Sequence, residues 1–399
     1  MSVPPDRCDA AIVGAGPAGS VLARELALRG RSVVLIERAT FPRRKVCGAC
    51  LSGHAVRELT AAGLGGLLEQ RGAIPQTGFR LGVEARGRAP RAAFVETVGG
   101  FALSRSRLDA ALADAAVAAG AVALFGTGAS VGADRTLTLK GEHAGTLRAG
   151  AVVVACGLSG AGAVLSRDRE RASVPGRDRS GALPDDRGSE SLKSDVRPGS
   201  RVGAGCELEP GAFDADFFAP GTIHMAVAAG GYVGATVTEG GELNLAGAYD
   251  LGFLKESGGP GPASAAIFEA AGFPVAEGMA AADWTGTPPL TRTAGAVAAD
   301  GVFLVGDAAG YVEPFTGEGM GWALASARAA ADPIDAFLQG DPAAEARWRR
   351  AYRRWIGRRK GWCRAVAVAA RTPLAATVAA AALNRAPMLA RPLVRHLAG

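Results

Sequence analysis

Short apolar runs alternate with stretches of helical spacing near the start of the chain. Residues 8–13 are apolar, and the motif GAGPAG separates them from SVLARELALRG, whose apolar residues recur at helical spacing. Gly30 follows the last helical turn, as a terminating glycine commonly does. The apolar run within residues 31–38 then predicts a second strand. The pattern therefore predicts a strand–turn–helix–strand unit.

Further along, the pattern predicts a second sheet. Residues 202–290 are rich in glycine and hold short alternating runs at 222–228, 232–237 and 243–248, which are typical of antiparallel strands. The other expected elements are strands at 76–103, 121–125, 136–140, 151–155 and 301–305, and helices at 54–70, 103–120 and 319–338. We predict the α/β class: a Rossmann-type cofactor domain, an inserted antiparallel β-sheet substrate domain and a helical C-terminus.

These elements divide the chain into segments. The cofactor domain is expected from residues 1–75, 104–165 and 291–340, and the substrate domain from 76–103 and 202–290. Two further segments are residues 166–201 and 341–399. The first is rich in Arg and Asp and poor in large apolar residues, so we expect a mobile charged segment, either a linker or a lid over a substrate. The second is expected to be a basic and apolar helical C-terminus.

Composition narrows the class of protein. Of 399 residues, 48% are hydrophobic and 21% charged, which excludes a disordered or fibrous chain. The net charge of +6 arises mostly from residues 347–364, so a nucleic-acid partner is not predicted. The start lacks the features of a signal peptide, and the apolar segment 372–384 is too short to span a bilayer. We expect a cytoplasmic protein, soluble or peripheral to a membrane.

The six cysteines are too few for a disulfide framework in a chain of this length. Cys47 and Cys50 form a Cys-x-x-Cys pair, which suits a redox pair or half of a zinc site. No second Cys or His pair with zinc-finger spacing follows in the sequence, so no metal is predicted.

A phosphate-binding turn lies directly after the first predicted strand. Gly14, Gly16 and Gly19 form G-x-G-x-x-G, with Pro17 and Ala18 between the last two glycines. The first glycine permits the tight turn, the second lets the backbone approach a pyrophosphate, and the third lets helix and strand pack closely. The pyrophosphate then meets the N–H groups at the positive end of the helix dipole.

Glu37 ends the second predicted strand, 23 residues after Gly14. A carboxylate there can accept hydrogen bonds from ribose hydroxyls, and it disfavours a 2′-phosphate, so NADP is not expected at this site. The alternative is a solvated acid at a strand end. Arg38 follows and is included among the predicted cofactor-binding residues. At this point the ligand is NAD or FAD.

A second motif favours FAD. In GVFLVGDAAGYVEPFTGEG, a buried strand leads to Gly306 and Asp307, and a helix begins near Gly319 and Met320. Asp307 can bind a ribityl hydroxyl, and the helix N-terminus suits the negative charge of a reduced flavin ring. NAD dehydrogenases need no such element.

The pairing of GAGPAG with GDAAGYVEPFTGEGMGWAL resembles the flavoproteins that include the aromatic hydroxylases of the para-hydroxybenzoate hydroxylase type, the geranylgeranyl reductases and the flavin-dependent halogenases. The stretch KVCGACLSGHAV is similar to a loop of the geranylgeranyl reductase branch. The resemblance implies that Lys45 and Cys47 lie near the flavin ring. It also implies that Arg107 of SRSRLDAAL lies near the pyrophosphate or the ribityl chain.

The chain departs from these relatives in three places. Ala155-Cys156-Gly157 lacks the Asp that these enzymes usually carry after the strand, which in hydroxylases helps to position cofactor and reductant. The geranylgeranyl reductases carry Tyr-x-Trp-x-Phe-Pro along the substrate channel. Here Tyr232 is kept, but the other places hold Gly234, Thr236 and Val237. The Trp-x-Trp-x-Ile-Pro motif of halogenases has no counterpart, the nearest stretch being DWTGTP at 283–288.

The flavin itself carries the redox chemistry, so the expected catalytic residues are those around its ring. They are Pro314, Thr316, Gly317, Glu318, Cys47 and Tyr232. Alternatives stay open for Glu318, which suits a helix start, for Cys47, which suits a structural role, and for Tyr232, which suits the core of the sheet. His54 and His224 are candidates for acid–base work, although a lone His on an apolar sheet is more often a core residue.

At the C-terminus, Trp348, Tyr352 and Trp355 fall on one helical face, and arginines such as Arg350 and Arg353 fall elsewhere. This pattern suits a helix that packs on a domain, or peripheral contact with anionic lipid.

We expect a FAD-dependent oxidoreductase that uses NADPH or NADH. The first hypothesis is a monooxygenase that hydroxylates a hydrophobic aromatic or polyketide-like molecule. The alternatives are a reductase of C=C bonds in a lipid or isoprenoid, a halogenase, and a FAD-holding binding protein without turnover.

Overall fold

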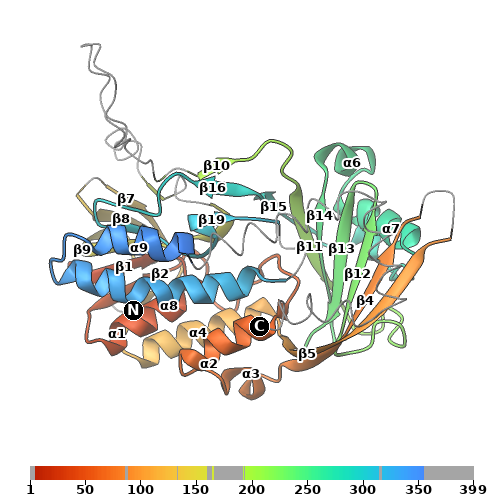
Figure 1. Ribbon diagram of the computed structural model, residues 1–399, viewed down its shortest axis with the longest axis horizontal. Coiled ribbons are helices and arrows are strands. Elements are labelled where there is room, and N and C mark those ends of the chain that lie inside the picture. Colours follow the sequence, from red (N-terminus) through yellow and green to blue (C-terminus); the bar gives the residue numbers. More distant parts are fainter. Residues whose placement is uncertain are drawn as a thin grey trace, which may run out of the picture.

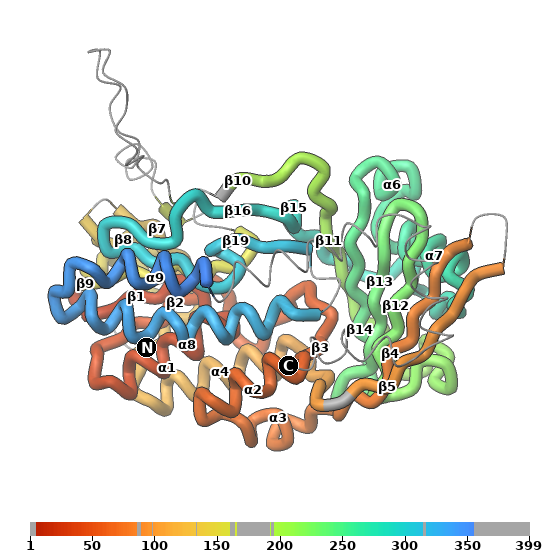
Figure 2. The backbone as a smooth tube through the Cα atoms, viewed as in Figure 1, coloured from red at the N-terminus to blue at the C-terminus, as the bar shows by residue number. Residues whose placement is uncertain are grey.

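A computed structural model describes residues 5–85, 89–132, 134–159, 164–165, 192, 194–313 and 317–354. In Figure 1 the Rossmann-type sheet with its helices lies on the left and a second large sheet lies on the right. The chain passes between the two parts several times, as the colours of the tube in Figure 2 show. In the described residues, no helix combines the length and apolar character needed to cross a membrane.

The first sheet has the strand order β17-β18-β9-β1-β2-β6, and β8 and β7 extend it from β9. Its strands are β1 (Arg7–Val13), β2 (Val33–Ile36), β6 (Val122–Leu124), β7 (Thr127–Val131), β8 (Thr136–Gly141), β9 (Gly145–Val154), β17 (Ala298–Ala299) and β18 (Val302–Leu304). β1 pairs in parallel with β2 and with β9, and β18 pairs in parallel with β9. β2, β18 and the second halves of β1 and β9 are apolar and buried, because the parallel centre of the sheet is covered on both faces.

Helices cover one face of this sheet. They are α1 (Pro17–Leu28), α4 (Arg105–Ala118) and α8 (Gly319–Leu338), with α2 (Gly53–Ala61) and α3 (Leu67–Gln70) further out. α9 (Ala344–Tyr352) packs against α8 and β17. α1 packs against both α4 and α8. Gly306, directly after the end of β18, has its β-carbon position 3.8 Å from Ala323 Cβ in α8. The N-terminal part of α8 therefore lies at the carboxyl edge of the parallel strands, where α/β folds bind their ligands.

The second sheet has the order β15-β11-β14-β13-β12-β4-β5-β3. Its strands are β3 (Cys50–Leu51), β4 (Ile74–Val83), β5 (Arg91–Ala102), β11 (Val202–Leu208), β12 (Thr222–Ala228), β13 (Gly231–Val237), β14 (Leu243–Tyr249) and β15 (Thr285–Pro289). Neighbours are antiparallel, except that β4 and β12 run parallel where the two separate pieces of chain meet. α7 (Pro260–Ala270) covers one face, with α6 (Leu251–Glu256) beside it.

A small third sheet, β10-β16-β19, lies between the two large ones. It consists of β10 (Ser194–Val196), β16 (Arg292–Ala294) and β19 (Gly310–Tyr311). Short 3-10 turns complete the described fold: η1 (Gly157–Ser159), η3 (Met279–Ala281) and η4 (Gly306–Ala309).

The predicted fold class is confirmed, with local differences. The helix expected over residues 54–70 is two helices, α2 and α3, because Gly63 adopts a left-handed φ of +71° and ends the first. Within the expected charged segment, residues 166–191 and 193 lie outside the described residues, and 194–196 form β10. At the C-terminus α9 is described, and residues 355–399 lie outside the described part.

Candidate cofactor and active site

Two positions of the GAGPAG turn must be glycine, because other backbone segments lie where a β-carbon would stand. Gly14 has φ +110°, and a β-carbon there would lie 2.5 Å from the carbonyl oxygen of Ala155. A β-carbon at Gly19 would lie 1.8 Å from the carbonyl oxygen of Gly14. These positions bring β1, α1 and the end of β9 together, as the fingerprint requires.

Gly16 differs from them, because its surroundings are open. A β-carbon at Gly16 would meet no protein atom closer than 3.9 Å, and the two atoms at that distance are guanidinium nitrogens of Arg43 and Arg105. Gly16 also caps α1, whose first turn has no side-chain cap. The uncapped first turn of the helix and two guanidinium groups thus face one space. The residues present fit the pyrophosphate of FAD.

A buried carboxylate orients both cations. Asp109 of α4 is fully buried and accepts hydrogen bonds from Arg105 Nε at 2.8 Å and Nη2 at 2.7 Å. Arg43 Nη2 lies 3.1 Å from the same carboxylate. Each guanidinium is held in place before any ligand binds, which lowers the ordering cost of recognition.

Glu37 is buried at the end of β2, and its carboxylate is tied to the same loop. Its Oε2 accepts from the N–H of Ala15 at 3.1 Å, and its Oε1 accepts from the N–H of Ala39 at 3.2 Å. This holds the acid beside the glycine turn, where a ribose would meet it. Arg38 is exposed.

Lys45 and Asp307 join this cluster from distant parts of the chain. Lys45 Nζ lies 2.8 Å from where a β-carbon of Gly157 would stand, so the ammonium occupies the turn that lacks the family's Asp. Burial lowers the pKa of Lys45, the neighbouring Arg105 and Arg43 lower it further, and Asp109 and Asp307 oppose the change. An anionic ligand here would raise the pKa of the amine.

The GDAAG motif packs against the GAGPAG motif through small residues. Gly306 has φ +60°, and its β-carbon position is 3.0 Å from the β-carbon of Ala18 in α1. Its N–H donates to Ser326 Oγ at 2.8 Å. Asp307 is therefore held in the η4 turn next to the glycine loop, at the place expected for a ribityl partner.

The expected ring side is formed by the start of α8. Gly317 has φ +71°, and its β-carbon position is 3.9 Å from Cys50 Cβ, while that of Gly319 is 3.4 Å from the Tyr311 ring. Glu318 and Met320 are buried at the helix start. Pro314 and Thr316 lie outside the described residues.

The Cys47 loop is held by the second sheet. Asn244 Nδ2 of β14 donates to the carbonyl oxygen of Cys47 at 2.8 Å. Cys50 Sγ lies 2.9 Å from the carbonyl oxygen of Gly48 and 3.3 Å from Thr236 Oγ1. Burial raises the pKa of Cys50 to about 11, so its thiol stays protonated at neutral pH. Thr236 therefore fastens the loop at a place where the related reductases carry an aromatic residue.

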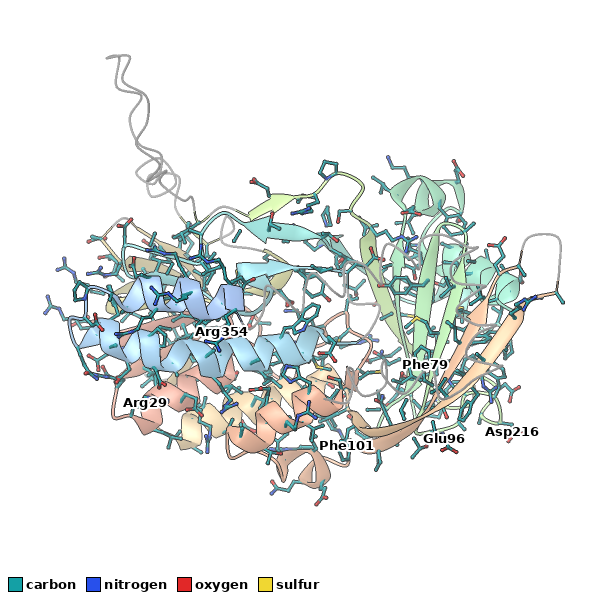
Figure 3. The ribbon with its side chains drawn as sticks, viewed as in Figure 1. Arg29, Phe79, Glu96, Phe101, Asp216 and Arg354 are labelled. Carbon is teal, nitrogen blue, oxygen red and sulfur yellow. The ribbon has the colours of Figure 1, made fainter. Side chains whose placement is uncertain are left out.

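Tyr232 lies on the face of the second sheet that is turned toward the cofactor domain. It belongs to an apolar cluster, here called the facing cluster, which joins both domains. Its members are Leu81, Val83, Met225, Val227, Tyr232, Ala248, Leu290 and Tyr311, with Phe79 and Leu158 packed against them. Figure 3 labels Phe79 on this sheet. Tyr311, which the sequence analysis did not assign, links this cluster to Gly319 at the start of α8.

The two candidate histidines lie in different places. His224 is buried on the other face of the sheet, with the rings of Phe217, Phe218 and Phe273 around it. Burial and then the charge of Arg80 lower the pKa of His224 to about 4. His54 packs against Gly321 of α8 and lies 3.9 Å from Glu58.

The structure places Arg107 differently from the expectation. Its side chain is 55% exposed and pairs with Glu239 at 3.2 Å. The arginine of this helix start that lies beside Gly16 is Arg105. The motif SRSRLDAAL carries both residues, and its i,i+4 pairing of Arg105 with Asp109 was the signal that could have identified the inner one.

A buried ion cluster ties the second sheet to the loop before α8. Arg201, 3% exposed, donates from Nη1 to Glu313 Oε1 at 3.1 Å and from Nε to Asp250 Oδ1 at 3.0 Å. Glu313 is 1% exposed and directly precedes the PFTGEG stretch. The Arg201 guanidinium also lies 5.8 Å from the Tyr232 ring centroid. The cluster holds the two domains together beside the expected ring position.

The aromatic face of α9 packs on the cofactor domain. Trp348 is fully buried and donates to the carbonyl oxygen of Val297 at 3.1 Å, and Tyr352 donates to that of Ala309 at 2.5 Å. Trp355 lies outside the described residues.

Comparison with known proteins agrees with this geometry. Residues 7–155 match the family model described as "FAD binding domain". The chain is 30% identical to the menaquinone reductase of Mycolicibacterium smegmatis over 338 residues, which cover 82% of this chain and 76% of that protein.

Solved structures share the fold across most of the chain. The flavin-dependent brominase Bmp2 superposes with a TM-score of 0.74 and 17% identity, covering 98% of this chain and 93% of that one. PqsL of Pseudomonas aeruginosa superposes with a TM-score of 0.63 and 19% identity, covering 93% and 98%. Identities this low support the fold alone. The family match, the relative and the arrangement around Gly16 and Asp307 together show that this chain is an enzyme and belongs to the FAD-dependent oxidoreductase family that includes the menaquinone reductase of Mycolicibacterium smegmatis.

Proposed function

We propose that this enzyme is a reductase that saturates a C=C bond in a lipid or isoprenoid-bearing molecule, with NADPH or NADH as the source of electrons. The observation that carries the proposal is the facing cluster, an apolar surface with two tyrosines that reaches the start of α8. Similarity to a menaquinone reductase over most of the chain supports the same class of substrate.

Different residues of the chain would bind the cofactor and supply the proton in such a reaction. Arg43, Arg105 and the first turn of α1 bind the pyrophosphate, and Glu37 binds the ribose. When bound, reduced FAD supplies a hydride to one carbon of the double bond. Saturation then needs a proton on the other carbon, and a phenol in the facing cluster can donate it. Burial raises the pKa of Tyr311 above its ordinary value, so this residue keeps its proton until it is used.

The hydroxylation predicted from the sequence rested on the intact PFTGEG stretch together with a more open substrate wall, where small residues such as Gly234 and Thr236 replace aromatic ones. In the structure, Met225 Cε lies 3.5 Å from the β-carbon position of Gly234, and Thr236 contacts Cys50. The room left by the small residues is therefore taken up by neighbours, which favours reduction over hydroxylation.

Mass spectrometry of the product separates these reactions. The FAD-loaded enzyme is incubated with menaquinone and NADPH deuterated on its reactive carbon, once without oxygen and once in air. A product of the anaerobic reaction that keeps a gain of two hydrogens after its quinol ring is reoxidised to the quinone supports the reductase, and loss of that gain on reoxidation contradicts C=C reduction. A product that forms only in air and contains one added oxygen atom supports the monooxygenase and overturns the proposal.

A further inference from the structure

Among the residues that the structure describes, the arginines with little exposed surface have carboxylate partners, with one exception. Arg43 and Arg105 lie 3.1 and 2.7 Å from Asp109, and Arg201 lies 3.1 Å from Glu313. Arg292 in β16 is equally buried, with 7% of its surface exposed. In the described part of the chain no Asp or Glu lies within ion-pair distance of it.

The contacts of Arg292 use only part of its hydrogen-bonding capacity. Its Nη1 donates to the carbonyl oxygen of Leu158, and its buried Nε has no hydrogen-bond partner in the residues that the structure describes. Burial lowers the pKa of Arg292, and the group that opposes this is the thiol of Cys156 rather than a carboxylate. A guanidinium has five N–H donors and keeps its charge, so burial without an anion is costly.

The position of Arg292 puts it beside both domains. Its backbone pairs with Tyr311 in β19, and Leu158 follows the turn after β9 that faces Lys45. Leu158 and Tyr311 both belong to the facing cluster with Tyr232. Arg292 is therefore at the boundary between the cofactor turn and the proposed substrate surface.

We propose that Arg292 binds an anionic oxygen group, a carboxylate or a phosphate, on a ligand other than FAD. The planar guanidinium matches such groups with two parallel hydrogen bonds, which a lysine cannot reproduce. The FAD pyrophosphate already has Arg43, Arg105 and the N–H groups at Gly16. The group belongs either to the nicotinamide dinucleotide or to an acidic, apolar substrate, and this proposal does not depend on which reaction the enzyme performs.

Binding to the FAD-loaded protein tests the proposal without turnover. The probes are NADPH, NADH and decanoate, titrated against wild type, Arg292→Gln and Arg292→Lys by calorimetry. We expect the affinity for the dinucleotides or for decanoate to fall at least ~10-fold in Arg292→Gln, and to fall in Arg292→Lys as well, because a bidentate pair is lost. The probe that is weakened identifies the source of the anion. Arg107→Gln, at an exposed arginine, should bind every probe as wild type does.

Two results would overturn the proposal. One is unchanged affinity of both Arg292 variants for all three probes. The other is a parallel loss of FAD affinity, measured by release of flavin fluorescence, since the anion would then be the cofactor's own. If Arg292→Gln does not fold, as judged by circular dichroism, the Arg292→Lys titration decides alone, since it keeps the charge and loses the paired geometry.

Discussion

At Gly16 the backbone leaves room for a ligand rather than for a side chain. A β-carbon there would lie 3.9 Å from two guanidinium nitrogens and touch nothing else within that distance, whereas at Gly14 and Gly19 it would meet backbone. The glycines of this motif thus have different roles: Gly14 and Gly19 allow close backbone packing, and Gly16 leaves space for a ligand. Only the middle one can be replaced without disturbing the protein itself.

Gly16→Val should therefore fold and fail to hold FAD. The branched side chain fills the space in which the pyrophosphate meets Arg43 and Arg105. We expect a colourless protein with a melting temperature close to that of the wild-type apoprotein, measured by absorbance near the flavin band and by thermal denaturation. Gly286→Val, at a position equally open but in β15, is the matched control and should remain yellow. A yellow Gly16→Val protein would remove the assigned site.

A second residue-scale prediction concerns pH. His224 has a pKa of about 4 in the folded protein against an ordinary value of 6.5, because it is buried among phenylalanines. Between these values the unfolded chain binds a proton that the folded chain does not, so stability falls as the pH drops from about 6.5 toward 4. The full loss is roughly 3 kcal/mol.

His224→Leu should lack this component of the pH dependence. Urea denaturation of wild type and variant at several pH values between 4 and 7 measures it, and the difference between the two stability curves should change by roughly 3 kcal/mol over that range. His143→Leu, in the turn after β8, is the control and should follow wild type. Parallel curves for wild type and His224→Leu would show that the folded protein protonates His224 normally.

At the scale of elements, hydrophobic periodicity predicts the start of the chain and α8 well. The residues of β1, α1 and β2 and the span Gly319–Leu338 match the expected strands and helix, since apolar spacing and glycine punctuation act locally. Contacts between distant elements leave no such local pattern. Arg201 and Glu313 are separated by 112 residues, and only the folded chain brings them together. The choice between Arg105 and Arg107 has the same origin, because packing decides which residue of a helix start points inward.

The Arg201–Glu313 pair should contribute to stability mainly because each side chain compensates the buried charge of the other. Arg201→Met removes the counter-charge of a carboxylate that is 1% exposed, and we expect a loss of about 3 kcal/mol in the free energy of unfolding. Arg201→Met combined with Glu313→Gln should lose less than the sum of the single changes. Urea denaturation of all four proteins completes the cycle.

The exposed pair of Arg44 and Glu207 provides the comparison. Their side chains are 57% and 32% exposed, and Arg44→Met should change stability by less than ~1 kcal/mol. Additive losses across the Arg201 and Glu313 variants would mean that the two side chains act independently and do not join the domains.

At the scale of the whole molecule, α9 combines a buried aromatic face with an exposed basic one. Trp348 and Tyr352 bond to the cofactor domain, while Arg347, Arg350 and Arg353 are exposed. Figure 3 labels Arg354, which follows just after the end of this helix. The described aromatic side chains are thus already used for packing. If this surface meets a membrane, which is one of the two alternatives that the sequence pattern leaves open, attraction between its arginines and anionic headgroups must hold it there.

That attraction should make membrane binding depend on ionic strength. Wild-type protein mixed with vesicles containing phosphatidylserine should float with them at low ionic strength and stay behind at high ionic strength, because screening weakens surface charge interactions. Arg350→Glu combined with Arg353→Glu should abolish flotation, whereas Lys255→Glu, on the distant α6, should leave it unchanged. Flotation that survives high salt would point to apolar insertion instead. Absence of flotation at low salt would leave α9 as a helix that only packs on its domain.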